Sequence, residues 1–190
     1  MQGEKAIRRF GEQLKKGFTI IELMVVIAVI GILVTLVTKA ATSSVKEARV
    51  KNSQVMASTI KMGIASYRAY KGEWPGVIET YAEQGRSPQG NSAKRGALSP
   101  NDADAVVQEV VKESGQGNPL LDVSGLFVAN KSVADARQGY GLRYTEARKQ
   151  NVSLANMAFG YQRKRDGVFR RFLICYDPTN DTVSVERPEE

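Results

Sequence analysis

The sequence predicts an α+β protein in which a long N-terminal α-helix packs, through its second half, on a C-terminal head built as an antiparallel β-meander. Three observations predict this class. An apolar run occupies 18–37, a pattern without Pro or Gly continues to residue 62, and short apolar stretches separated by turn residues fill 156–187. Apolar runs of helix length and short alternating runs are the primary signals of helices and strands, respectively.

Composition excludes several kinds of chemistry. The 190 residues, with a formal net charge of +7, have room for one ordinary domain and one extra element. The sequence contains no histidine and one cysteine, Cys175, which argues against Ser-His or Cys-His catalysis and against most metal sites. We therefore expect no enzyme, no cofactor and no disulfide within these residues, with Cys175 as a small buried strand residue.

The apolar run Phe18–Val37 is long enough to cross a bilayer. Twenty helical residues span about 30 Å, and the only polar members are Thr19, Glu22 and Thr35. A secretory signal peptide is one interpretation, but the run is long for an h-region and no clear A-x-A site follows it. The alternatives are a plain membrane anchor and an anchor that is cleaved in front of the run, between Gly17 and Phe18.

The residues around this junction favour cleavage. A basic leader, with five Lys or Arg against two Glu, ends at Gly17 and is followed by FTIIELMVVIAVIGIL. This string closely resembles the class III signal of type IV prepilins and of the pseudopilins of type II secretion, although the leader is longer than the commonest ones. The resemblance implies that a prepilin peptidase cuts after Gly17 and methylates the new amino terminus of Phe18. It also implies that Glu22 serves subunit assembly.

Electrostatics explains why an acid such as Glu22 would stand near the start of the apolar run. Cleavage creates an α-amine on Phe18, and Glu22 lies four residues later on the same helix face. A charge at the centre of a membrane helix costs about 2.5–3.5 kcal/mol on insertion scales. Subunits stacked with an axial offset would bring Glu22 of one copy to the amine of another, so the pair would set their register. The alternative is a snorkelling Glu22 at the membrane interface without a partner.

The helical pattern continues beyond the apolar run, so we expect one helix from Phe18 to Lys71. Its amphipathic part should bury a stripe at steps of three and four, and Gly72, Pro75 and Gly76 should end it. A membrane tether followed by an unrelated soluble helix is the alternative. The expected stripe contains Val45, Ala48, Asn52, Val55, Thr59, Gly63 and Tyr67, widened by Met56, Ile60 and Ile64. The expected domains are a leader at 1–17, a transmembrane helix at 18–37, its amphipathic continuation at 38–72 and a globular head at 73–190.

The head is read from local signals. Ser99 and Pro100 predict the start of a short helix with an apolar face, and residues 83–100 predict a loop. A strand is expected near Leu126–Val128. The stretches NMAFGYQ, VFRRFLICYD and DTVSVER predict a three-stranded meander with turns at 164–167 and 178–180. The aromatic pattern at the helix end also resembles major pseudopilins, in Tyr67, Tyr70, Trp74 and Pro75.

Two short motifs have alternative interpretations. QRKRDG at 162–167 is a nucleic-acid contact or, as we favour, a solvated hairpin turn, so no nucleic-acid partner is expected. Asp177 and Asp181 in DPTND are candidate calcium ligands. Major pseudopilins commonly bind calcium near the C-terminus, but their Gly-rich acidic loop is not recognisable here, and no metal site is assigned.

The resemblance implies a structural pseudopilin, processed and assembled into a short periplasmic pseudopilus for type II secretion. Its implied partners are further copies in a helical fibre, other pseudopilins, the prepilin peptidase, an inner-membrane platform protein, an assembly ATPase and membrane lipid. It would be a single-pass inner-membrane protein with a periplasmic head. One alternative is a major or minor type IV pilin for adhesion, motility or DNA uptake, whose common C-terminal disulfide the lone Cys175 does not allow. A membrane-anchored periplasmic binding module is another, and it would require a concave polar site.

Overall fold

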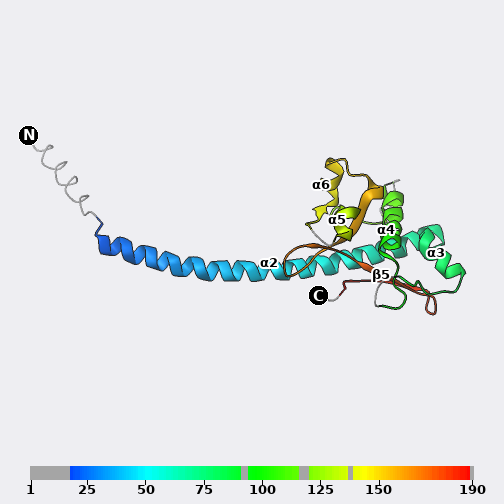
Figure 1. Cartoon of the computed structure of the whole chain (residues 1–190), viewed down its shortest axis with the longest axis horizontal. Coiled ribbons are helices and arrows are strands. Elements are labelled where there is room, and N and C mark those ends of the chain that lie inside the picture. The colour runs from blue at the N-terminus through cyan, green and yellow to red at the C-terminus, as the bar shows by residue number, and fades with distance from the viewer. Residues whose placement is uncertain (1–17, 91–93, 116–119, 137–138, 189–190) are drawn as a thin grey trace, which may run out of the picture. The chain divides into compact units, whose positions relative to one another are not determined.

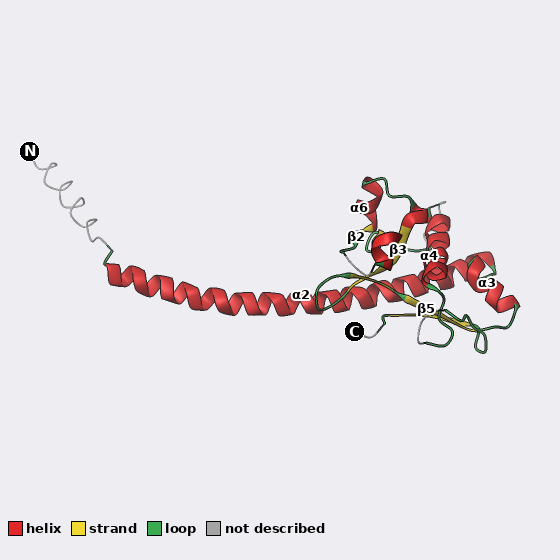
Figure 2. Cartoon of the chain, in the orientation of Figure 1, coloured by secondary structure: helices red, strands yellow, loops and turns green. Residues whose placement is uncertain are grey.

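The computed structural model describes residues 18–90, 94–115, 120–136 and 139–188. The chain divides into two compact units, residues 1–44 and 45–190, and we describe each by itself. Helix α2 (Ile20–Lys71) contributes its N-terminal part to the first unit and the rest to the second. Figure 2 distinguishes the helices and strands of the second unit, which we call the head.

The described part of the first unit is a bare apolar helix. Helix α2 begins at Ile20, two residues after the expected start, and its side chains are exposed throughout 20–44. Thr35 Oγ1 donates to the Gly31 carbonyl at 2.9 Å and Thr38 Oγ1 to the Val34 carbonyl at 2.7 Å, so both hydroxyl groups are satisfied within the helix. By length and composition, α2 is able to cross a membrane.

Within the head, α2 buries one face against the core, and the expected stripe is confirmed in part, at Met56, Ile60, Gly63, Ile64 and Tyr67. Val45 and Val55 remain 50% and 62% exposed, and Asn52 is also exposed, so the predicted stripe was wrong at these positions. The sequence carries apolar residues on two neighbouring faces, and periodicity alone does not say which one the head covers. The buried residues are Ser53, Met56, Ala57, Ile60, Gly63, Ile64 and Tyr67.

Two helices follow the turn after Lys71. Helix α3 (Gly76–Glu83) was not expected from the sequence; Ile78 is its buried residue. Helix α4 (Pro100–Ser114) is confirmed: Ser99 Oγ accepts from the Asp102 amide at 3.2 Å, and Pro100 takes the first helical position. In Figure 1, α3 and α4 lie beside the end of α2. The apolar face of α4 enters the core through Ala103, Val106, Val107, Val110 and Val111.

The head has a four-stranded antiparallel sheet in the order β2-β1-β3-β4. Strand β1 (Phe127–Asn130) confirms the expected strand with a small shift, and it pairs with both β2 (Leu142–Arg143) and β3 (Met157–Gln162). Short helices lie between these strands: α5 (Lys131–Asp135), α6 (Tyr144–Lys149) and a 3₁₀ turn at Leu154–Asn156. Strand β4 (Phe169–Arg171) closes the sheet by pairing with β3.

The expected three-stranded meander was wrong, because VFRRFLICYD forms two strands. Phe172 separates β4 from β5 (Leu173–Asp177), which pairs with β6 (Thr182–Glu186) in a second sheet. The Phe172 side chain is buried, with its ring centroid 5.2 Å from that of Tyr161. The other edge of β5 is paired by the loop before α4, where the Leu98 amide donates to the Ile174 carbonyl at 2.9 Å. Burial of an aromatic side chain thus accompanies the change of sheet.

Asp181 fastens the β5–β6 hairpin to the end of α2. Its carboxylate accepts from the Trp74 indole N–H at 2.8 Å, from the Tyr176 hydroxyl at 3.0 Å and from the Arg68 guanidinium. The Arg68 guanidinium also lies 4.2 Å from the Trp74 ring centroid. The expected turn at 178–180 is confirmed, and Asp181 leaves it in the left-handed conformation with φ of 49°. The α+β class of the sequence prediction is confirmed.

Candidate functional site

The candidate site is the start of α2, where Phe18, Thr19 and Glu22 precede or open the apolar helix. Gly17, the residue expected in front of the cleavage point, lies outside the described residues. Phe18 is 80% exposed, and Glu22 is exposed one turn later in the first turn of the helix. An exposed apolar side chain thus precedes an exposed carboxylate by four residues at the point where cleavage is expected.

Thr19 and Glu22 form a capping box. The Thr19 amide and hydroxyl donate to Glu22 Oε2 at 2.8 and 2.9 Å, and the Glu22 amide donates to Thr19 Oγ1 at 3.2 Å. Such reciprocal bonds satisfy amide groups that the first turn leaves without partners. Our sequence prediction missed Thr19, although the spacing T-x-x-E before an apolar run is the ordinary signal of this motif.

The capping box leaves part of the Glu22 carboxylate available. Both hydrogen bonds to the carboxylate end on Oε2, so Oε1 accepts no hydrogen bond from the described residues. A carboxylate has about four lone-pair sites and can accept bonds on both oxygens. Glu22 is thus able to cap its own helix and to accept an external cation at the same time.

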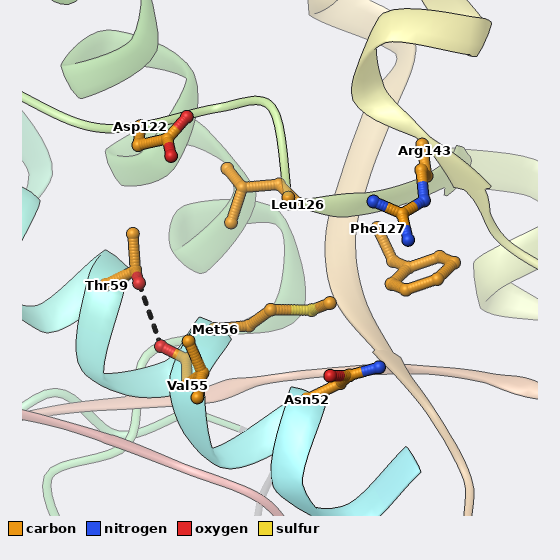
Figure 3. Close-up of a pocket in the computed structure, with 9 residues that line it drawn as sticks. Asn52, Val55, Met56, Thr59, Asp122, Leu126, Phe127 and Arg143 are labelled. Carbon is orange, nitrogen blue, oxygen red and sulfur yellow. Dashed lines mark hydrogen bonds between the residues drawn. The ribbon is translucent and has the colours of Figure 1, made fainter. Parts of the chain in front are cut away.

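A groove in the head tests the binding-module interpretation. It encloses about 170 Å³ between α2 and strand β1, which is smaller than most small-molecule pockets. Figure 3 shows the Arg143 guanidinium beside the Phe127 ring, with a separation of 5.9 Å from the ring centroid. The Thr59 hydroxyl is directed to the Val55 carbonyl at 2.9 Å rather than into the groove. The groove therefore lacks a convergent set of polar groups and gives little support to a ligand-binding role.

The side chains of the two short motifs, DPTND and QRKRDG, form hydrogen bonds and ion pairs within the head. In DPTND, the carboxylate of Asp181 is engaged by Arg68, Trp74 and Tyr176, and the Trp74 hydrogen bond is the main reason that its pKa lies below the usual value. Asp177 accepts from the Thr179 amide at 2.9 Å. Protein donors therefore occupy the carboxylates that we considered for calcium.

The basic motif at 162–167 forms the turn between β3 and β4, as we favoured. The Arg163 amide donates to the Val168 carbonyl at 2.9 Å, and Gly167 takes φ of 75°. Asp166 pairs with Arg163 inside the turn, and this interaction holds the pKa of Asp166 well below its usual range. Lys164 and Arg165 are exposed. The motif is thus a hairpin turn with a basic outer surface.

Comparison with known proteins identifies the class of the N-terminal segment. Residues 13–38 match the model of the prokaryotic N-terminal methylation motif, a range that contains the Gly17–Phe18 junction, the capping box and the apolar helix. The N-terminal segment thus carries this methylation motif, and the chain is similar to type IV pilins. The interpretation of the apolar run as an ordinary secretory signal is not supported.

The relatives found are fimbrial proteins. The chain is 32% identical over 105 residues to a fimbrial protein of Neisseria meningitidis, covering 52% of this chain and 62% of that protein. It is 31% identical over 125 residues to the type IV major pilin protein PilE1 of Neisseria gonorrhoeae, covering 65% of this chain and 61% of the relative. The matches thus span less than two thirds of either relative. No solved structure matches the chain.

Proposed function

We propose that the chain is a structural subunit of a type IV pilus-like fibre, released for assembly by cleavage between Gly17 and Phe18. The observation that carries the proposal is Glu22, which caps its helix through Oε2 and keeps Oε1 available at the start of an exposed apolar helix. The methylated α-amine of Phe18 in a neighbouring copy is the cation that we assign to it. The pair would offset the cost of a lipid-buried charge only when subunits join.

The named relatives favour a surface pilus over a secretion pseudopilus. Each relative reported above is a fimbrial protein or a major pilin, and none is named as a pseudopilin. The pseudopilus remains a second candidate because Cys175 is the single cysteine of the 190 residues and is buried as a free thiol. A C-terminal disulfide of the kind common in pilins is therefore not available within this chain.

The proposed location and partners follow from the same role. One helix would anchor the subunit in the inner membrane, with the head in the periplasm and no reaction catalysed by the chain. Prepilin peptidase, an inner-membrane platform protein and an assembly ATPase would act on it, and copies of the chain would form the fibre. The exposed apolar side chains of α2 support this proposal, because they require either lipid or other subunits as their environment.

Intact-mass measurement of the mature protein tests the processing step. We expect a chain that starts at Phe18 and carries one extra methyl group, and we expect Gly17→Ala to retain the leader. Gly3→Ala, a glycine substitution elsewhere in the leader, is the matched control and should be processed normally. A mature chain that starts at any other residue would refute the proposal.

Glu22→Gln tests the assembly step without removing the helix cap. Glutamine keeps an oxygen acceptor for the Thr19 amide, as in other capping boxes, but it cannot neutralise an ammonium group. We expect normal processing and membrane insertion, with loss of fibres. Comparison of surface fibres and secreted proteins after deletion of the whole protein would then separate a pilus from a pseudopilus.

A further inference from the structure

Charge is distributed unevenly over the head. The turn between β3 and β4 lies against α2 near the start of the head, where Arg49 Nη1 donates to the Lys164 carbonyl at 3.4 Å. Four residues further along the helix, Ser53 Oγ accepts from Arg187 Nη1 at 3.1 Å. These contacts gather basic side chains from three segments of the chain. We call this surface the basic end, formed by Lys46, Arg49, Lys164, Arg165 and Arg187.

Carboxylates gather where α2 ends. Glu109 accepts from the Tyr67 hydroxyl at 2.6 Å and from the Gly76 amide at 2.9 Å, and Glu79 accepts from the Trp74 amide at 2.7 Å. These donors are neutral, so the carboxylate charges are not cancelled by them. Lys71 pairs with Glu113 at 3.0 Å. We call this surface the acidic end, formed by Glu73, Glu79, Glu109 and Glu113.

Two further observations support the separation of positive charge at the basic end from negative charge at the acidic end. Burial, together with the carboxylates of Glu109, Glu113 and Glu73, raises the pKa of Tyr67, which places these three acids around one hydroxyl. The eighteen residues of helix from Arg49 to Tyr67 correspond to about 27 Å. The two ends are therefore separated by several Debye lengths and act as distinct surfaces at physiological salt.

We propose that the acidic end of one head docks on the basic end of another copy in the fibre. The inference rests on the proposed function, because subunits anchored by N-terminal helices in one membrane share one polarity. Copies of equal polarity make heterologous contacts, in which one surface of a subunit meets a different surface of the next and the assembly extends as a filament. Opposite charges on the two surfaces favour that contact, and like charges disfavour the reverse docking.

Charge reversal at each end tests the proposal in cells that assemble the wild-type fibre. Lys46→Glu with Arg165→Glu reverses exposed charges at the basic end. Glu73→Lys with Glu113→Lys reverses the acidic end, where Glu73 is exposed and Glu113 is partly buried beside Lys71. This variant leaves Glu79 and Glu109, which bind backbone amides, in place. We expect either double variant to lower the yield of sheared fibre by about tenfold or more. The matched control is Arg148→Glu with Lys149→Glu, an exposed pair on α6.

The quadruple variant separates charge matching from misfolding. It exchanges the signs of both ends, so every contact between copies regains an opposite partner, and we expect fibre yield to recover at least in part. Normal yield from both double variants would overturn the docking proposal, as would a quadruple variant no better than either double. If the wild type itself is cleaved elsewhere or forms no fibre in any condition, the proposed function fails instead.

Discussion

The indole N–H of Trp74 donates to Asp181 Oδ1 at 2.8 Å, which joins the end of the long helix to a hairpin 107 residues further along the chain. Arg68 and Tyr176 bind the same carboxylate, so three segments of the head meet at one acidic side chain. The Trp74 and Tyr176 rings are also in edge-to-face contact, with centroids 6.2 Å apart. This cluster gives the first of four predictions.

Asp181→Asn should lower the free energy of unfolding by about 1–2 kcal/mol, because a charged acceptor is replaced by a neutral one at a partly exposed site. Asp181→Ala should cost more, because alanine also resists the left-handed conformation with φ of 49° that asparagine tolerates. Urea unfolding followed by Trp74 fluorescence measures both. Asp177→Asn in the same turn is the control, and equal losses from all three variants would contradict the assignment.

Gly63→Ala should destabilise the head although alanine favours helices. A Cβ at position 63 would lie 2.8 Å from Leu121 Cδ1 and 3.4 Å from the Leu120 carbonyl oxygen, so the segment over α2 would have to shift. Overpacking of this kind costs about 1–3 kcal/mol, which exceeds the helix-propensity gain of about 1 kcal/mol. Gly31→Ala is the matched control, since nothing lies within 4 Å of its added Cβ, and it should leave the unfolding of the head unchanged.

Thr19→Val should separate helix capping from assembly. It removes the hydroxyl that accepts from the Glu22 amide but keeps both the shape of the residue and the Glu22 charge. Loss of a cap costs about 1 kcal/mol, so we expect a frayed first turn by hydrogen exchange and fibres that still form. If Thr19→Val abolishes fibres as completely as Glu22→Gln, the carboxylate acts through the cap and not through a neighbouring amine.

Asp104 should make the stability of the head fall as pH rises from about 4 to about 6. Burial raises the pKa of this carboxyl to about 6, although the Arg171 guanidinium at 3.0 Å opposes the shift. The folded state therefore holds a proton that the unfolded state releases over this range, and the free energy of unfolding decreases by about 3 kcal/mol across it.

The comparison with Asp104→Asn isolates this effect from other acids. Asp166 and Asp181 have lowered pKa values and make stability rise with pH, but they are present in both proteins. The difference between the two pH profiles should therefore grow only between pH 4 and 6. Parallel profiles in that window would show that the Asp104 carboxyl titrates normally.

The features set by local sequence were the predictable ones. The apolar run, the cap at Ser99 and the hairpin turn at Gly167 each carry a signal within a few residues, and each is confirmed. The change of sheet at Phe172 depends on what the Phe172 ring packs against, and no local pattern reports that. The buried face of α2 was predicted only in part for the same reason, because contacts such as that between Gly63 and Leu121 join segments far apart in the sequence.

The candidate site also contains features that the local sequence predicts and features that it does not predict. The motif around Phe18 and Glu22 was readable because residue types and spacing define it. The capping role of Thr19 was readable as well but was overlooked. The hydrogen bonds that Asp181 accepts could not be predicted from the sequence, because the donors are separated from Asp181 by as many as 113 residues.

That separation has a consequence for how quickly the head acquires its native form. Contacts between segments more than one hundred residues apart close a large loop, and proteins rich in such contacts fold slowly. The terminal turn of α2 stays without its carboxylate partner until the β5–β6 hairpin arrives. A newly made subunit therefore passes through an interval in which Trp74 is solvated. A delayed loss of quenching of Trp74 fluorescence by a soluble quencher would report the packing of the β5–β6 hairpin on the end of α2.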